Sequence, residues 1–467
     1  NSLRTEDDVD VNNPYESFDG VKGKIVELLS TQGGNRFLQK VIEELRVQAL
    51  GNQEQNGMNI NNFQQDPASR SDQLHGGNII TNSAESAPLL ARVIDDILDE
   101  LGITWQVDEM YFSHLLPLCC DQFANYTCQK IILMATRQQR IKIAQILQRN
   151  ILTISQNSFG TRVIQRLIET ANTSDQRQAV SRGLQNHVAE LSRDPYGVHT
   201  VLRTIAVWSG DWVSRDRNGN VYGKHQQYQD EDRIQGQIEC DFIYQEVVRE
   251  FHSFTSNRHG CSFLQKIFKL SAPRHRQLII NALITVGPLN RGRLRGQWGN
   301  YAADMAADTF ANYFMQDVVG MEWDSIDPQC ILRGRFFELF VPQFAWLSMH
   351  KCASNVMQKL IQSCDPSTRS KIVNMITTEH PEDQDNSKMG YSRGGETVLT
   401  RLMCDQFGNY VMQDLINLAT SEQLRLIIEC IFRNPQNEQV LNSSVFGRKI
   451  ISRLEGTVEW QTRAHRQ

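Results

Sequence analysis

Amide and ring side chains that recur at a fixed spacing carry the clearest chemical signal in this chain. Residues 121–129 read Asp-Gln-Phe-Ala-Asn-Tyr-Thr-Cys-Gln, and residues 308–316 and 405–413 repeat the Asp, Phe, small, Asn, Tyr and Gln positions in register. A carboxamide can meet N3–H and O4 of uracil, and a Tyr ring can stack on a base. A single copy would favour a solvated helix face with a half-buried ring, but recurrence in register favours base recognition.

Weaker copies appear when the pattern is relaxed to a small residue followed by a five-residue motif that ends in Gln. The pairs of first and fifth motif residues are Asn35/Gln39, Asn125/Gln129, Thr161/Gln165, Cys261/Gln265, Asn312/Gln316, Ser354/Gln358 and Asn409/Gln413. Val198/Leu202 fits the frame without polar groups, so we assign this pair to packing. A degenerate terminal copy begins at Gly447.

The motif recurs at the length of a three-helix repeat. Its first residue moves from 125 to 161 and then to 198, intervals of 36 and 37 residues, and longer intervals hold one unit plus an insertion. The first and fifth residues are four apart and share one face of a helix, with the second residue beside them. We therefore expect an exposed amide pair flanked by a stacking group.

Local signals place each motif at the start of a helix. An Asp stands three residues before the small residue at 121, 194, 308 and 405, where it can cap a helix N-terminus. The small residue, Gly or Ala, allows close helix stacking, and flanking apolar residues supply a core. These features predict an all-helical solenoid.

Composition limits the classes that remain. The chain has 467 residues, a formal charge of −5 and 40% hydrophobic residues, which would suggest about three globular domains unless it is a repeat array. There is no apolar run of bilayer length and no leader of charged then apolar residues, so we expect a soluble protein. The slight excess of acidic residues argues weakly against binding nucleic acid by bulk charge alone.

The cysteines indicate a reducing compartment. The ten cysteines show no C-x-x-C pair and no Cys/His set at zinc spacing, so we expect buried or half-buried thiols and no metal or other cofactor. His350 with Cys352, and His114 with Cys119, could be imagined as nucleophile pairs, but they lack an orienting acid. We do not expect an enzyme.

Composition also marks a leader and four insertions. Residues 1–20 form an acidic leader, and residues 21–467 form the repeat domain, interrupted at about 48–87, 208–238, 286–300 and 378–396. Residues 89–101 predict an amphipathic helix beside the first insertion. The basic stretch 291–296 could contact phosphates, although an ordinary exposed loop is favoured. The insertions leave room for a homodimer.

With these motifs the chain resembles the Pumilio (PUF) family of RNA-binding proteins from about Val21 to Glu459. The resemblance implies a right-handed superhelical solenoid of eight Pumilio-type helical repeats plus a degenerate C-terminal capping repeat. It also implies that the first and fifth motif residues read a base edge while the second residue stacks. The implied stacking residues are Arg36, Tyr126, Arg162, His199, Tyr313, Asn355 and Tyr410.

The resemblance assigns bases to repeats. Asn/Gln pairs look like uracil readers, and a small first residue with Gln looks like an adenine reader. Guanine would need a carboxylate at the fifth position, where Gln358 departs from the family pattern. The literal reading, with RNA antiparallel to the chain, is 5′-U-A-U-A-n-A-U-U-3′, with a shorter UAAU-like core as an alternative. Cations that follow the fifth residue and could meet phosphates are Lys40, Lys130, Arg166, Arg203, Lys266 and Lys359, a series that Asp317 and Asp414 break.

The implied function is sequence-specific binding of single-stranded RNA at A/U-rich elements of mRNA 3′ untranslated regions. The family further implies post-transcriptional regulation in the cytoplasm, by translational repression or mRNA decay through a deadenylase complex. Two alternatives stay open. One is a sequence-tolerant nucleolar PUF-like RNA-binding protein, disfavoured by the seven polar pairs. The other is a protein-binding helical scaffold of the HEAT or armadillo kind.

Overall fold

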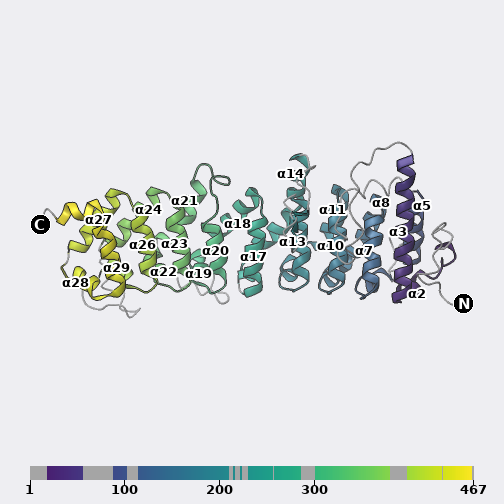
Figure 1. Cartoon of the computed structure of the whole chain (residues 1–467), viewed down its shortest axis with the longest axis horizontal. Coiled ribbons are helices and arrows are strands. Elements are labelled where there is room, and N and C mark those ends of the chain that lie inside the picture. Colours follow the sequence, from purple (N-terminus) through teal and green to yellow (C-terminus); the bar gives the residue numbers. More distant parts are fainter. Residues whose placement is uncertain are drawn as a thin grey trace. The chain divides into compact units, whose positions relative to one another are not determined.

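The computed structural model describes residues 18–55, 88–102, 114–209, 214–215, 221–222, 230–255, 257–285, 300–378, 397–433 and 435–464. The chain divides into two compact units, Asn1–Val247 and Val248–Gln467. Both units are predominantly helical, as predicted (Figure 1). Strand pairing among the described residues is confined to β1 (Ser214–Arg215), which pairs antiparallel with β2 (Val221–Tyr222).

Each repeat contains three helices, as the repeat length predicts. A short helix packs on the motif helix that follows it, and a further helix joins a second row. In the first unit the short helices are α2 (Ile25–Leu29), α6 (Leu115–Cys119), α9 (Ile151–Ser155) and α12 (Val188–Leu191). The motif helices are α3 (Gln32–Gln55), α7 (Ala124–Met134), α10 (Gly160–Thr170) and α13 (Gly197–Trp208). The second row holds α5 (Pro88–Glu100), α8 (Arg137–Leu147) with η2 (Gln148–Asn150), α11 (Ser174–Leu184) and α14 (Asp230–Glu239).

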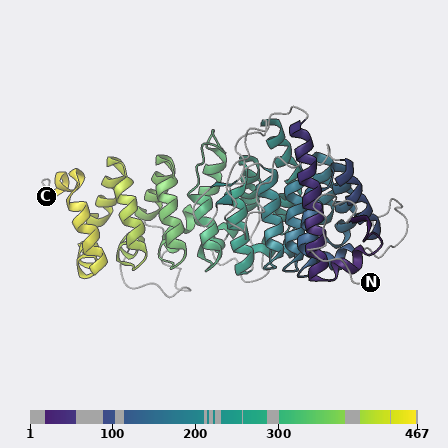
Figure 2. The same ribbon diagram turned by 45° about the vertical axis from the view of Figure 1, so that its right-hand side comes forward.

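The second unit repeats this order, after α15 (Asp241–Arg249) at the division. Its short helices are α16 (Phe251–Thr255), α19 (Tyr301–Ala307), α22 (Phe344–Ser348), α25 (Val398–Cys404) and α28 (Pro435–Ser443). Its motif helices are α17 (Arg258–Leu270), α20 (Ala311–Val319), α23 (Ala353–Ser363), α26 (Gly408–Leu418) and the degenerate α29 (Val445–Glu455). Its second row holds α18 (Pro273–Thr285), α21 (Ile331–Glu338) with η3 (Val341–Gln343), α24 (Pro366–Thr377), α27 (Ser421–Arg433) and α30 (Val458–Ala464). Within each unit every motif helix contacts the next (Figure 1 and Figure 2).

The predicted capping side chains begin the motif helices. Asp121 Oδ1 accepts hydrogen bonds from the backbone N–H groups of Phe123 and Ala124 at 2.8 and 2.7 Å. Asp194, Asp308 and Asp405 make the same pair of bonds in α13, α20 and α26. The remaining motif helices are capped from the same position by Thr31, Asn157, Asn257, His350 and Ser444. The capping position is thus used in every motif helix, by several residue types.

The small residue in the first turn lets each motif helix approach its short helix closely. A Cβ atom on Gly34 would lie 2.2 Å from the carbonyl oxygen of Leu28, which is nearer than real atoms approach. Apolar side chains fill the contact behind it, including the fully buried Leu28, Phe37 and Val41. Helix packing therefore requires the small residue that recurs in the sequence.

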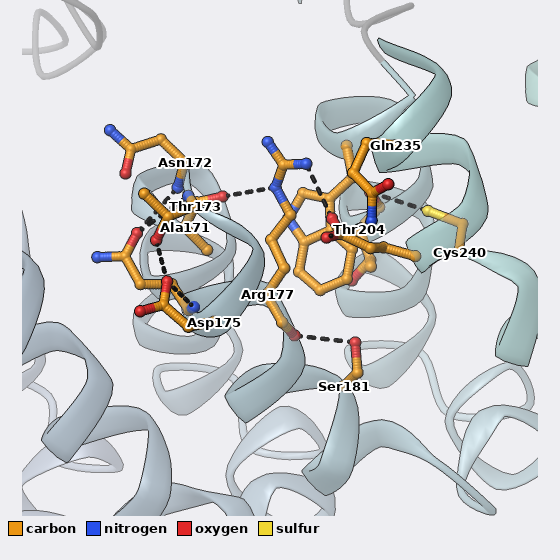
Figure 3. A network of polar contacts seen from close by, with 12 residues as sticks. Ala171, Asn172, Thr173, Asp175, Arg177, Ser181, Thr204, Gln235 and Cys240 are labelled. Carbon is orange, nitrogen blue, oxygen red and sulfur yellow. Dashed lines mark hydrogen bonds and ion pairs between the residues drawn. The ribbon is translucent and has the colours of Figure 1, made fainter. Parts of the chain in front are cut away.

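Two parts of the expected insertions are helical instead of loop-like. Helix α3 continues to Gln55, inside the first insertion, and α14 closes the second. Arg177 on α11 donates to the carbonyl of Ala171 at 3.0 Å (Figure 3). It also donates to Glu239 Oε2 at 2.8 Å, which links α14 to α11. Gly236 seats α14 against the carbonyl of Trp208, where a Cβ atom would lie 1.9 Å away. The insertion expected at about 208–238 is therefore helical over 230–238.

The remaining insertion residues are not described. They fall at 56–87, 210–213, 216–220, 223–229, 286–299 and 379–396. The basic stretch 291–296 and most of the acidic leader also lie outside the described residues. The helix predicted at 89–101 is confirmed as α5. None of the helices in the described ranges is long and apolar enough to cross a membrane.

Candidate nucleic-acid interface

The second motif residues are the exposed members of each motif. Tyr126, Tyr313 and Tyr410 are 55%, 59% and 53% exposed, although large aromatic side chains are usually buried. The other residues predicted to stack, namely Arg36, Arg162, His199 and Asn355, are exposed as well. Exposure of the three Tyr rings makes them accessible for stacking on a planar group.

The first motif residues are buried, which corrects our expectation of a fully exposed amide pair. Asn35, Asn125, Asn312 and Asn409 are at most 3% exposed. Asn125 Nδ2 donates to the carbonyls of Asp121 and Gln122 at 2.8 and 3.1 Å, in the turn that precedes α7. The corresponding asparagines of α20 and α26 make the same two bonds. Both amide hydrogens of the Asn are thus consumed inside the protein, since a carboxamide has only two.

The fifth residue is oriented by the first. Gln129 Nε2 donates to Asn125 Oδ1 at 3.1 Å, Gln316 to Asn312 at 3.0 Å and Gln413 to Asn409 at 3.1 Å. These glutamines are half-buried. Each therefore keeps Oε1 and one N–H for an external partner, on a carboxamide whose direction is fixed.

Repeats with a small first residue differ from one another. Gln165 donates to Thr161 Oγ1 at 3.0 Å, so this glutamine is also held. Cys261 Sγ and Ser354 Oγ donate to nearby carbonyls, and Gln265 and Gln358 make no side-chain hydrogen bond within the described ranges. The small side chains leave space beside the Gln that Asn fills elsewhere. Val198 and Leu202, the pair assigned to packing, are half-buried.

The sixth motif residue, which follows the Gln, pairs with the ninth residue of the preceding motif helix. Lys130 Nζ lies 2.8 Å from Glu43 Oε2, and Arg203 Nη1 lies 3.2 Å from Glu169 Oε1. Arg166 pairs with Glu169 of its own helix at 2.8 Å. We call the contacts between neighbouring helices the sixth–ninth ladder. Three of the six cations predicted to meet phosphates thus already have a carboxylate partner.

The ladder also explains the two acidic residues that break the cationic series. Lys269 Nζ lies 3.1 Å from Asp317 Oδ2, an ion pair whose angle does not suit a hydrogen bond. Gln362 Nε2 donates to Asp414 Oδ2 at 3.3 Å, and Arg453 Nη1 donates to Asn417 Oδ1 at 2.8 Å. The sixth residue is an acid where the ninth residue of the preceding motif helix is a hydrogen-bond donor or a cation, so the two positions are complementary.

The other predicted phosphate residues are less constrained. Lys40 is half-buried, and Lys266 and Lys359 are exposed, with no carboxylate partner for either of the latter two in the described ranges. The ninth residue that faces Lys359 is Gly320, which has no side chain to pair with. Lys359 also lines a cavity of about 270 Å³ together with Gln316 and Asp317.

The ladder shifts the pKa values of its members. Burial raises the pKa of Glu43, but the hydrogen bond and charge of Lys130 and the charge of Arg46 outweigh it, and the net pKa is lowered. Burial lowers the pKa of Arg203, although the charge of Glu169 opposes this. Both groups remain charged near neutral pH.

The imagined nucleophile pairs do not have a suitable geometry. His350 Nδ1 accepts from the backbone N–H groups of Cys352 and Ala353, at 3.3 and 3.4 Å, and is used to cap α23. The hydrogen bond with Cys128, and then burial, raise the pKa of Cys119, which disfavours the thiolate. All ten cysteines are free, and Cys330 is exposed where we expected at least partial burial. No group of side chains in the described ranges could hold a metal ion.

Several interface residues lie outside the motif and were not predicted from the sequence. Glu43, Glu169 and Lys269 each lie four residues after the motif Gln, and therefore on the same helix face, so this spacing could have revealed them. Thr127 on α7 carries no such signal, because its partners, Asn35 and Gln39, lie on α3.

The three-helix repeats and the recurring motif define a helical-repeat protein that presents amides and exposed rings on its motif helices. A family model described as a NOP9-like PUF repeat domain matches residues 109–390, and one described as a Pumilio-family RNA binding repeat matches residues 24–48 and 400–432. The chain belongs to the Pumilio (PUF) repeat family.

Curated relatives and solved structures agree with this assignment. A Pumilio domain-containing protein of Schizosaccharomyces pombe is 24% identical over 73% of this chain and 40% of its own length. Pumilio homolog 12 of Arabidopsis thaliana is 23% identical over 74% of this chain and 48% of its own length, so the chain spans less than half of these relatives. The RNA-binding domain of yeast Puf5p bound to SMX2 RNA has a TM-score of 0.56 and 18% identity, covering 93% of this chain and 97% of that one. The Puf4 RNA binding domain, bound to an HO endonuclease RNA 3′ UTR recognition sequence, has a TM-score of 0.53 and 20% identity, covering 92% and 98%.

Proposed function

We propose that this protein binds single-stranded RNA sequence-specifically, one base to each motif helix, and prefers A/U-rich elements in mRNA 3′ untranslated regions. The observation that carries the proposal is the same hydrogen-bonded Asn–Gln pair beneath an exposed Tyr in α7, α20 and α26. A surface that needed only solubility would not hold three carboxamides in one orientation.

Base choice follows from the groups left free. A fixed carboxamide with one acceptor and one donor can match uracil, which offers N3–H and O4, and it can also match adenine. The first motif residue must therefore separate the two bases. Asn fills the space beside the Gln and favours the smaller pyrimidine, whereas Thr161, Cys261 and Ser354 leave room for a purine. This reading supports 5′-U-A-U-A-n-A-U-U-3′ or a shorter UAAU-like core.

By family membership, the regulatory outcome would be translational repression or mRNA decay in the cytoplasm through a deadenylase complex. We further propose a homodimer through the insertions, which the mass of the purified protein in solution tests. The regulatory proposals depend on RNA binding and fall if it fails, whereas the homodimer does not.

A second candidate is a sequence-tolerant nucleolar PUF-like RNA-binding protein. The match of residues 109–390 to the NOP9-like model favours it, as does the loss of reading groups in α13. Selection of bound sequences from a random RNA pool separates the candidates. An enriched A/U motif supports the main proposal, binding without enrichment supports the second, and absence of RNA binding leaves the protein-binding scaffold.

A further inference from the structure

The first repeat builds its reading pair with a residue of the next repeat. Thr127 lies on α7, which packs beside α3, and is fully buried (Figure 1). Its hydroxyl donates to Asn35 Oδ1 at 2.7 Å and accepts from Gln39 Nε2 at 3.0 Å. Asn35 Nδ2 in turn donates to the carbonyls of Leu29 and Thr31 at 2.7 and 2.8 Å.

This arrangement differs from the other Asn/Gln repeats. Gln129, Gln316 and Gln413 donate directly to the Asn of their own helix. Thr127 is the third motif residue of the helix that follows α3. The third motif residue is Val356 on α23, which follows α20, and Ile450 on α29, which follows α26, and neither has a hydroxyl. Among the third motif residues that the structure describes, Thr200 also has a hydroxyl, and its Oγ1 lies 3.5 Å from Thr161 Oγ1.

We propose that Thr127 is a positioning residue that sets the base preference of α3, an inference that rests on the proposed base-reading function. A Thr hydroxyl has one hydrogen, and here Asn35 takes it. The Thr oxygen must then accept from Gln39, which turns Nε2 toward α7 and leaves Oε1 and one N–H outward.

The orientation of Gln39 decides between the two pyrimidines. Uracil presents O4 as an acceptor and N3–H as a donor, whereas cytosine presents an amino donor and N3 as an acceptor. A carboxamide that rotates by half a turn exchanges its donor and acceptor and so exchanges its complement. Loss of the Thr127 hydroxyl releases this rotation, and the preference for uracil over cytosine falls.

The test measures the affinity of the full chain for 5′-UAUAUAUU-3′ and for RNAs in which one base is replaced by each of the other three, at the last base, which α3 reads, and at each other position in turn. Thr127→Val and Thr127→Ala both remove the hydroxyl but leave side chains of different volume, so the test needs only one of them to fold. Thr127→Ser keeps the hydroxyl. We expect wild type and Thr127→Ser to prefer a final U over C by roughly 5- to 150-fold. In Thr127→Val and Thr127→Ala this ratio falls severalfold toward one, while preference at the seventh base, read by α7, is unchanged.

Thr200→Val is the matched control, because it makes the same substitution at the same motif position of α13. It should leave the ratio at the last base unaltered. An unchanged ratio in folded Thr127→Val or Thr127→Ala, or an equal loss at every base, would overturn the inference while base reading stands. Wild type without preference at any position would instead refute the proposed function itself.

Discussion

At the scale of single residues, the buried first motif Asn chiefly orients the Gln. Its two N–H groups donate to carbonyls of the turn before the helix, and its oxygen accepts from the Gln. Replacing Asn by Cys or Ser therefore changes two properties together, the space beside the Gln and the freedom of its carboxamide, whereas Thr161 still holds Gln165. Gln358, beside Ser354, has both the space and the freedom, which makes it the natural position for changing specificity.

Gln358→Glu should move the preference at the second base of the RNA from adenine toward guanine. A carboxylate accepts from both N1–H and the amino group of guanine, and Ser354 leaves room for a purine. Each altered edge contact should be worth about 1–3 kcal/mol, measured by competition among four RNAs. Gln413→Glu is the control: it cannot donate to Asn409 Oδ1, so it should weaken binding without gaining guanine. Unchanged preference in Gln358→Glu would refute the assignment of that repeat.

His350 should make the start of α23 sensitive to pH. Burial lowers the pKa of His350 from its ordinary value near 6.5, and the neutral ring accepts two backbone N–H groups. As the pH falls through 6.5, His350 takes up a proton in the unfolded chain but not in the folded one. The free energy of unfolding therefore decreases until the pH reaches the folded-state pKa of His350. Amide hydrogen-exchange protection at Ala353 and Ser354 should therefore decrease between about pH 7.5 and about pH 5.5.

The control for this effect is His350→Asn, which keeps a capping acceptor that does not titrate. Its protection factors should be flat over the same range, as should those of α26, which Asp405 caps. A pH dependence that survives in His350→Asn would assign the effect to another group, such as His252, whose pKa burial also lowers.

At the scale of elements, the helix starts are encoded within a few residues of sequence and could be predicted. The capping residue, the small residue and the motif fall within nine consecutive residues, as in 121–129, so their spacing alone places them. The same spacing places the ladder residues on the motif face, but it does not give their partners on the neighbouring helix. The Thr127 bridge could not be predicted in this way either, because Asn35 and Thr127 are 92 residues apart. Their pairing depends on the stacking register of neighbouring helices, which local spacing does not contain. Burial of the Asn was missed because its partners are backbone carbonyls.

Gly34→Ala should destabilise the first unit, and Gly33→Ala on the same helix should not. A Cβ atom on Gly34 meets Leu28 O at 2.2 Å, whereas one on Gly33 meets nothing within 4 Å. Ala is tolerated at this position in α7, so the short helix can shift, and the cost should be about 1–3 kcal/mol. Gly33→Ala should be neutral or stabilising by up to about 1 kcal/mol. Urea titrations followed by circular dichroism would compare the two, and equal effects would contradict the close-approach argument.

At the scale of the whole molecule, composition predicts less than position. A formal charge of −5 gave a weak argument against nucleic-acid binding, and the length suggested about three globular domains. The structure has two units of stacked helices, in which charge is distributed by position, since acids and cations pair along the ladder. A repeat array presents a local surface many times, so its net charge does not describe that surface.

The salt dependence of RNA binding should separate ladder cations from phosphate contacts. Each phosphate contact on single-stranded nucleic acid contributes about 0.7 to the slope of log affinity against log salt. Lys266→Ala and Lys359→Ala should each reduce the slope by about that amount, because these exposed ammonium groups have no carboxylate partner in the described ranges. Lys130→Ala and Arg203→Ala should leave it unchanged, since Glu43 and Glu169 already neutralise them. Equal slope changes in all four variants, measured from about 50 to about 300 mM KCl, would show that RNA displaces the ladder carboxylates.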